Sequence, residues 1–210
     1  MTVRRWLALC GAAAAVLFAV GTGLSGGSPQ DDASAAKVVS YYRDHATSTK
    51  IGSLILVIAA VLLVLFAAQL REVLRRGEPG GRVFPVAAFG GAVILAVGAC
   101  LDAVVGFALA QAADHRFAGS AQTLNVLSNN DFFVLIGGIA TLLLATGIAT
   151  LRSPVLPRWL GWTAVVIAII SLAGPAGFVG AVLAMVWLLV VSIFMFRRAD
   201  QVAAGSIDTA

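Results

Sequence analysis

The stretch Ile51–Leu70 reads IGSLILVIAAVLLVLFAAQL and contains 20 consecutive residues without a formal charge. A helix needs about 20 mostly apolar residues to cross the hydrocarbon core of a bilayer, so this stretch predicts a membrane-spanning helix. The whole chain agrees, because 60% of its 210 residues are apolar and 11% are charged. Soluble domains have about 45–50% apolar and about 25% charged residues. The composition therefore excludes an ordinary cytosolic enzyme, a disordered chain and a disulfide scaffold.

Five further spans are predicted on the same grounds. The last apolar run, Trp159–Phe196, has 38 residues, which is too long for one span, and Gly174-Pro175-Ala176-Gly177 divides it into two. The fold class is thus an all-α membrane protein, a six-transmembrane-helix bundle formed by a single integral membrane domain of residues 1–210. The predicted spans are 6–24, 51–70, 84–112, 132–151, 157–174 and 178–196, followed by a flexible cytoplasmic tail at 199–210.

Basic residues determine the predicted orientation of these spans. Ten of the 14 Lys and Arg residues lie on the side that carries both termini, including Arg4-Arg5, Arg75-Arg76 and Arg197-Arg198. The positive-inside rule then predicts a multi-pass membrane protein with both termini in the cytoplasm. Topology also accounts for the net charge of +4. The expected partners are therefore the lipid bilayer and another membrane protein or a second copy, and not nucleic acid.

The first span has a second interpretation. Arg4-Arg5, an apolar run and the small residues of Gly21–Ser28 also describe a cleavable secretory signal peptide. We favour a retained span, because 19 apolar residues exceed the usual core of about 7–15 residues in a signal peptide.

Two outer loops are long enough to carry short amphipathic helices. In the first, Ser28-Pro29-Gln30-Asp31 predicts a helix start, and the helix is expected to run to His45. The second loop, Asp114–Asp131, ends in Ser128-Asn129-Asn130-Asp131, a capping-box pattern that leads into the fourth span. Both helices are expected to cover helix ends at the lipid interface. The alternative is a small external lid or a partner-binding surface.

Aromatic anchors and one short motif mark the inner side. Trp6, Trp159 and Trp162 are predicted interfacial anchors. The chain has a long outer loop after the first span, Leu-Arg pairs that end the second, and Leu156–Trp162, which reads Leu-Pro-Arg-Trp-Leu-Gly-Trp and opens the fifth. In these features it resembles a bacterial (actinobacterial) six-transmembrane family classed as a domain of unknown function. The resemblance implies a six-helix fold and no known activity or catalytic residue.

Asp102 is the one formal charge inside the apolar runs that define the predicted spans, and it is the first candidate for a functional role. A carboxylate at membrane depth costs about 2.5–3.5 kcal/mol on insertion scales, and such residues often mark proton relays or ligand sites. The apolar runs that define the spans contain no basic residue that could pair with it. Asp102 is therefore a ligand or proton site, or else a structural or interfacial aspartate.

The sequence offers few other candidate functional residues. Asp44-His45 and Asp114-His115 contain the two histidines and offer a weak hypothesis of an outer-face metal site. Cys10 and Cys100 are expected at different depths, too far apart for a disulfide. The chain has no phosphate loop and no spaced Ser/His/Asp set, so neither enzymatic activity nor a cofactor is expected. The paired glycines Gly90-Gly91 and Gly137-Gly138 predict points of close helix contact.

The sequence is compatible with three functions. The leading expectation is a non-enzymatic accessory or interaction component of the membrane. The alternative is a small transporter or channel that uses Asp102 as its proton or ligand site. A weaker alternative is an outer-face metal-binding protein that uses Asp44, His45, Asp114 and His115.

Overall fold

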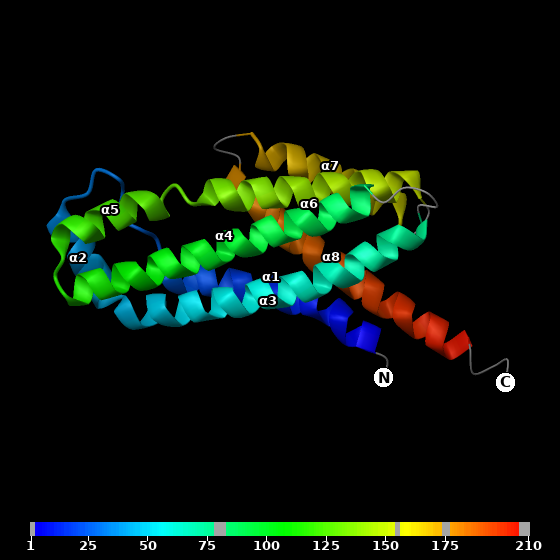
Figure 1. Ribbon diagram of the computed structural model, residues 1–210, viewed down its shortest axis with the longest axis horizontal. Coiled ribbons are helices and arrows are strands. Elements are labelled where there is room, and N and C mark those ends of the chain that lie inside the picture. The colour runs from blue at the N-terminus through cyan, green and yellow to red at the C-terminus, as the bar shows by residue number, and fades with distance from the viewer. Residues whose placement is uncertain (1–2, 78–82, 154–155, 174–176, 206–210) are drawn as a thin grey trace.

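The computed structural model describes residues 3–77, 83–153, 156–173 and 177–205, with side chains described within 6–197. Within these ranges the chain forms eight helices and no strand (Figure 1). The helices are α1 (Val3–Ser25), α2 (Ala35–Asp44), α3 (Ala46–Gly77), α4 (Val83–Asp114), α5 (Ala118–Ser128), α6 (Phe132–Arg152), α7 (Arg158–Ser171) and α8 (Gly177–Gly205).

Each of the six predicted spans coincides with one helix: α1, α3, α4, α6, α7 and α8. Five helical segments in the described part of the chain are long and apolar enough to cross a membrane. The sixth, α7, is apolar but has 14 residues, which corresponds to a length of about 21 Å. The chain is therefore an all-α, multi-pass membrane protein. Helix α8 continues to Gly205, so the first part of the predicted tail is helical, and residues 206–210 lie outside the described residues.

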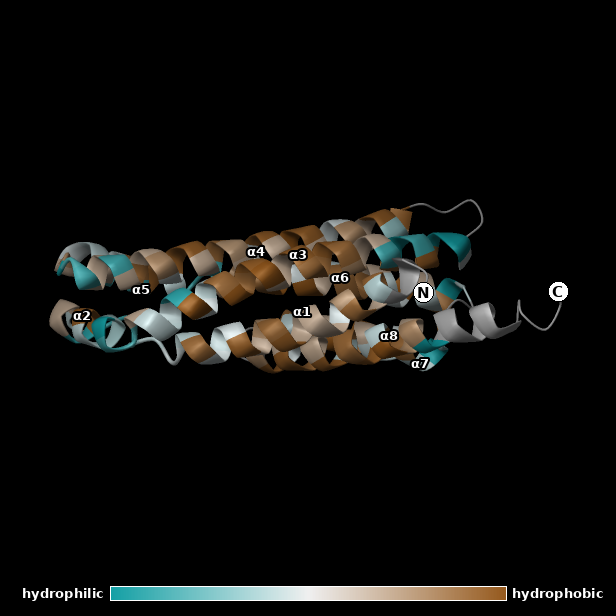
Figure 2. Cartoon of the chain, turned by 90° about the horizontal axis from the view of Figure 1, so that it is seen from below, coloured by the Kyte–Doolittle hydropathy of each residue, from teal (hydrophilic) through white to brown (hydrophobic). Residues whose placement is uncertain are grey.

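The six long or apolar helices form a closed ring. Following the contacts between neighbours, the order around the ring is α3, α4, α6, α7, α8 and α1, and α1 packs back against α3. The start of α1 and the end of α8 lie at the same end of the bundle, and α2 and α5 lie at the opposite end (Figure 1). Apolar residues fill the middle of the bundle, whereas hydrophilic residues gather at its two ends (Figure 2).

Glycines allow the closest approaches between neighbouring helices. A Cβ atom on Gly91 of α4 would lie 2.8 Å from the Cα atom of Leu142 in α6. A Cβ atom on Gly138 would lie 2.5 Å from the backbone nitrogen of Leu95. Close helix contact at these two glycines is confirmed, and their neighbours Gly90 and Gly137 face open space. In lipid such close packing drives helix association, because burial of apolar surface adds little there.

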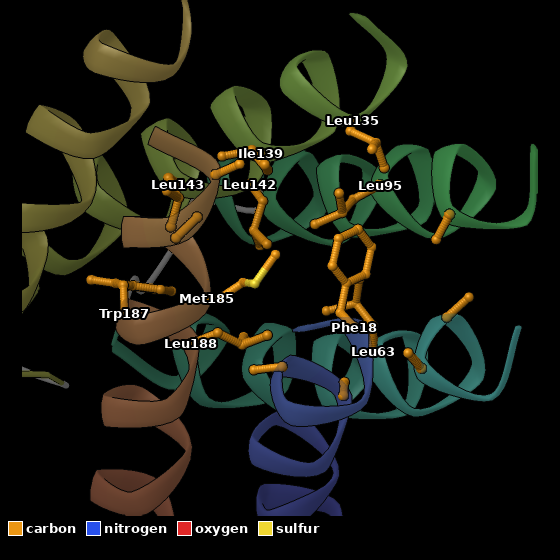
Figure 3. A pocket seen from close by; sticks show the side chains of 17 residues that line it. Phe18, Leu63, Leu95, Leu135, Ile139, Leu142, Leu143, Met185, Trp187 and Leu188 are labelled. Carbon is orange, nitrogen blue, oxygen red and sulfur yellow. The ribbon is translucent and has the colours of Figure 1, made fainter. Parts of the chain in front are cut away.

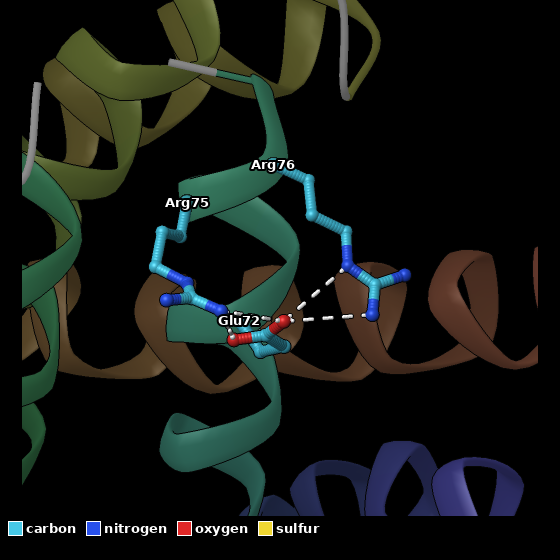
Figure 4. Close-up of polar contacts among 3 residues, drawn as sticks. All are labelled: Glu72, Arg75 and Arg76. Atoms are coloured by element: carbon cyan, nitrogen blue, oxygen red, sulfur yellow. Dashed lines mark hydrogen bonds and ion pairs between the residues drawn. The ribbon is translucent and has the colours of Figure 1, made fainter. Parts of the chain in front are cut away.

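Arginines surround the end of the bundle that carries the termini, which we call the basic end. Glu72 of α3 forms ion pairs of 3.1 Å with Arg75 and 3.4 Å with Arg76 (Figure 4). Arg152 lies over the ring of Phe84, with its Cζ atom 4.6 Å from the ring centroid. The predicted anchors are exposed: Trp6, Trp159 and Trp162 each keep more than half of their surface accessible.

The opposite end carries a second, smaller apolar core. Helices α2 and α5 pack on the last three turns of α4, and we call these two helices with the segment 26–34 the outer cap. Val38, Leu109 and Ala121 are completely buried there. Helix α4 needs its 32 residues because its first part belongs to the ring and its last part supports the cap.

Both predicted capping patterns in the outer loops need correction, although α6 begins at Phe132 as predicted. Helix α2 begins at Ala35 rather than at Ser28, and its cap is Ser34, whose side chain accepts a hydrogen bond from the backbone N–H of Lys37. Residues 28–31 instead lie against α5, where they are bound by Asn125 of α5 and by Asn129, which directly follows it. Asp131 is the N-cap of α6, but its side chain makes no capping bond, and Ser128 is the last residue of α5. Tertiary contacts have replaced the local capping that these sequences predict.

Candidate functional site

Asp102 lies near the outer end of the ring, where the cap begins. It follows Val83 by 19 residues, which places it about 29 Å along α4 from the basic end. The side chain is partly buried. Asp102 therefore lies close to the boundary between the apolar bundle and the outer cap, rather than at the middle of the bundle.

The packing of α4 against α6 brings a second carboxylate to Asp102. The two helices are antiparallel, and their contacts pair Gly91 with Leu142, Leu95 with Gly138 and Gly98 with Leu135. One turn further along both helices, the same register pairs Asp102 with Asp131. The two carboxylates are close enough for the charge of Asp102 to act on Asp131. We call Asp102 and Asp131 the acidic pair.

Asp131 is poorly solvated. Its Oδ2 atom is buried and has no hydrogen-bond partner. Burial raises the pKa of Asp131 to about 7, and the neighbouring carboxylate of Asp102 contributes to the increase. Two carboxylates that share one site resist simultaneous ionisation, because each charge disfavours the other. The acidic pair can therefore take up a proton near neutral pH.

Tyr42 and Asn125 lie above the acidic pair, within the cap. Tyr42 is 4% exposed, and its hydroxyl donates a long hydrogen bond of 3.5 Å to Oδ1 of Asn125. Asn125 is 1% exposed and donates through Nδ2 to the carbonyl of Pro29 at 3.0 Å. Burial raises the pKa of Tyr42 to about 12, and Tyr41 and the acidic pair contribute electrostatically. Tyr42 is thus a neutral hydroxyl at every physiological pH.

The segment 26–34 closes the cap over α5. Asn129 donates to the carbonyl of Pro29 at 3.0 Å and to Oδ1 of Asp31 at 2.6 Å. Ser28 donates to Oδ1 of Asn129 at 2.5 Å, and Gln122 donates to the carbonyl of Ala33 at 3.3 Å. These bonds join residues about 100 positions apart and tie the first outer loop to the second.

The acidic pair has no cationic partner within the described ranges. The ion pairs there join Lys50 to Asp114 at 2.6 Å and Glu72 to its two arginines, all at helix ends. No hydrogen bond involves the Asp102 side chain in the part of the chain that the structure describes. A partly buried carboxylate without a cation or a donor is costly, and it can lower that cost by accepting a proton or a bound cation.

The residues of the predicted metal site lie elsewhere and have other contacts. Asp114 is held by Lys50. His45 stacks on Tyr41 and its Nδ1 lies 2.9 Å from the carbonyl of Tyr41, and His115 stacks on Phe117. Asp44 is exposed at the end of α2. Among residues whose side chains are described, no three His, Cys, Asp or Glu side chains come together as metal ligands do. Cys10 and Cys100 are free thiols.

Sequence reasoning identified Asp102 and missed its neighbours. Asp131 is interpreted from the sequence as part of a capping box, because it follows Ser128 by three residues and precedes an apolar run. Tyr42 and Asn125 were given no role, since each lies in a loop expected to be amphipathic. The one signal available was Asp131 itself, a carboxylate directly at the start of an uncharged span of 20 residues.

Comparison of the chain with protein-family models, with curated protein sequences and with solved structures finds no match.

Proposed function

We propose that this chain is a protein of the bacterial plasma membrane with six spans and both termini in the cytoplasm. The arginines at the basic end support this orientation through the positive-inside rule. Helix α7 is the sixth span. Trp187 supports α7 from within the bundle, because its Nε1 donates to the carbonyl of Leu160 at 3.1 Å.

Cysteine labelling tests this topology. In a chain in which Cys10 and Cys100 are replaced by alanine, we expect Asp32→Cys and Ala173→Cys to react with a membrane-impermeant maleimide on intact cells. Arg76→Cys, at the basic end, should react only after the membrane is permeabilised. Labelling of Arg76→Cys on intact cells would contradict the orientation, and an unlabelled Ala173→Cys would contradict the sixth span.

We further propose that the acidic pair binds and releases a proton from the outer side of the membrane, as the coupling site of a small transporter or channel. The observation that carries this proposal is the buried, unpartnered Oδ2 atom of Asp131 opposite Asp102. Carboxylates in membrane-embedded helices commonly serve as proton relays. The neutral Tyr42 and the amide of Asn125 add polar groups above the pair without adding charge.

Proton flux into liposomes tests this function. The purified protein is reconstituted around a pH-sensitive dye, and a potassium diffusion potential drives protons inward. We expect the wild type to carry protons faster than protein-free liposomes do. The Asp102→Asn variant should show only the flux of protein-free liposomes. The matched control is Asp32→Asn, which changes an exposed aspartate of the outer loop and should keep the wild-type rate. Equal rates for wild type and Asp102→Asn would overturn the proposal.

An accessory role is the second candidate, and one feature of the cap favours it. Phe117, Val126 and Leu127 are exposed apolar side chains on or beside α5. They could contact another membrane protein at the outer surface. The flux experiment separates the two candidates, because a chain that serves only as an accessory component carries no proton current by itself.

A further inference from the structure

The ring of helices surrounds a partly enclosed cavity of about 70 Å³ (Figure 3). Five of the six ring helices line it, and α7 does not take part. Phe18 enters from α1, Leu63 from α3 and Leu95 from α4 (Figure 3). Helices α6 and α8 complete the wall with residues that include Leu135 and Met185. The cavity is thus built from segments far apart in the sequence.

The side chains around this cavity are all apolar, and seven of them are alanines. Trp187 is the one that carries a polar atom, and its Nε1 is already bonded to the carbonyl of Leu160 in α7. A water molecule needs two to four polar partners, so an apolar cavity of this kind stays free of water. Small apolar molecules do enter such cavities, as benzene enters an engineered cavity of about 150 Å³.

We propose that the central cavity binds the end of a hydrocarbon chain. Its volume is about half that of a cavity that holds benzene, so it has room for a few carbon atoms and none for a polar group. Without a guest, the side chains that line a void lose dispersion contacts on one side. Because several of these side chains are alanines rather than leucines, the cavity remains open in the folded protein.

The cavity is distinct from the acidic pair but reaches close to it. Ala99 lines the cavity one turn before Asp102 on α4, and Leu135 lines it one turn after Asp131 on α6. Neither carboxylate is part of the cavity wall. The cavity is therefore a second site, and its occupancy can be tested separately from proton binding by the acidic pair.

Trp187 offers a direct reporter of occupancy. It lines the cavity and is 4% exposed, whereas the other three tryptophans, Trp6, Trp159 and Trp162, are exposed at the basic end. Replacing those three by phenylalanine leaves Trp187 as the sole tryptophan of the chain. Bromine quenches tryptophan fluorescence at short range, so a bromine-labelled chain end in the cavity quenches Trp187.

The experiment compares two sources of the chain. The single-tryptophan protein is titrated with a short 1-bromoalkane, and it is separately reconstituted in phosphatidylcholine brominated near the ends of its acyl chains. We expect saturable quenching of Trp187 by at least one probe. Saturation by the bromoalkane alone indicates a free lipophilic molecule, and quenching in the brominated lipid indicates a membrane lipid. The proposal is overturned if the bromoalkane quenches Trp187 without saturation and the brominated lipid quenches it no more than it does in a variant whose cavity is filled.

A matched pair of variants compares a filled cavity with an open one. Ala14→Leu places extra carbon atoms in the cavity, since Ala14 lines it and is 3% exposed. Its neighbour Ala13 is exposed on the other face of α1, so Ala13→Leu leaves the cavity open. We expect Ala14→Leu to lose most of the saturable quenching and Ala13→Leu to keep it. Equal quenching in both variants contradicts the inference.

A second variant with a filled cavity controls for misfolding of Ala14→Leu. Ala184→Leu adds the same bulk from α8, on the other side of the cavity. Thermal unfolding provides an independent readout: the bromoalkane should raise the Tm of the wild type and leave the Tm of the folded, filled variants unchanged. A probe that raises the Tm of the filled variants equally binds elsewhere, and the cavity proposal then fails.

Discussion

Replacing Gly91 by alanine is expected to disrupt the packing of α4 against α6 and to lower the free energy of unfolding by about 3 kcal/mol or more. The added methyl group would lie 2.8 Å from the Cα atom of Leu142. Backbone atoms in the middle of a helix cannot move aside as the end of a flexible side chain can, so the two helices must separate. Separation also removes the dispersion contacts that hold helices together in lipid.

Thermal unfolding and size-exclusion chromatography of the purified protein in detergent measure this effect. The matched control is Gly90→Ala, one residue away, where a Cβ atom meets nothing within 4 Å. This control should stay within about 1 kcal/mol of the wild type, since alanine favours a helix over glycine by about that amount. Gly138→Ala and Gly137→Ala form a second such pair. A Gly91→Ala protein as stable as its control would show that α4 and α6 are not in this contact.

Replacing Asp131 by asparagine is expected to stabilise the protein at pH 8 and to reduce the dependence of its stability on pH. The pKa of Asp131 is about 7 in the folded protein, against about 3.9 for an unfolded aspartate. Between these values the folded protein retains a proton that the unfolded chain has lost. The contribution of Asp131 to stability is therefore greatest below about pH 4 and is lost as the pH rises to about 7.

Asparagine resembles the protonated carboxyl and should keep that contribution at high pH. An increase of the pKa from about 3.9 to about 7 corresponds to about 4 kcal/mol for a fully buried group. Asp131 is only partly buried, so we expect about 2 kcal/mol after solvent screening. Unfolding at pH 4, 6 and 8 measures the difference. Asp32→Asn is the control in the exposed outer loop, and identical pH profiles for wild type and Asp131→Asn would contradict a titrating carboxylate at this position.

The helices were largely predictable from the sequence, and the cap was not. Uncharged runs located all six ring helices, and the division predicted at 174–177 agrees with the end of α7 at Ser171 and the start of α8 at Gly177, although residues 174–176 themselves lie outside the described residues. The capping pattern at Ser28 was misleading, because Ser28 binds Asn129, which follows α5, and Pro29 binds Asn125 of α5, instead of starting a helix. Local rules fail where a loop finds hydrogen-bond partners about 100 residues away.

Membrane embedding and the positions of the helices follow from the sequence alone, because the length of an apolar run and the placement of charges are local properties. Only the tertiary structure shows that Asp102 lies opposite Asp131 and that five helices surround an apolar cavity. Both features depend on the register between helices, which close contacts such as Gly91 with Leu142 determine. The sequence marked Asp102 as a lone charge, and the fold shows it as half of a pair.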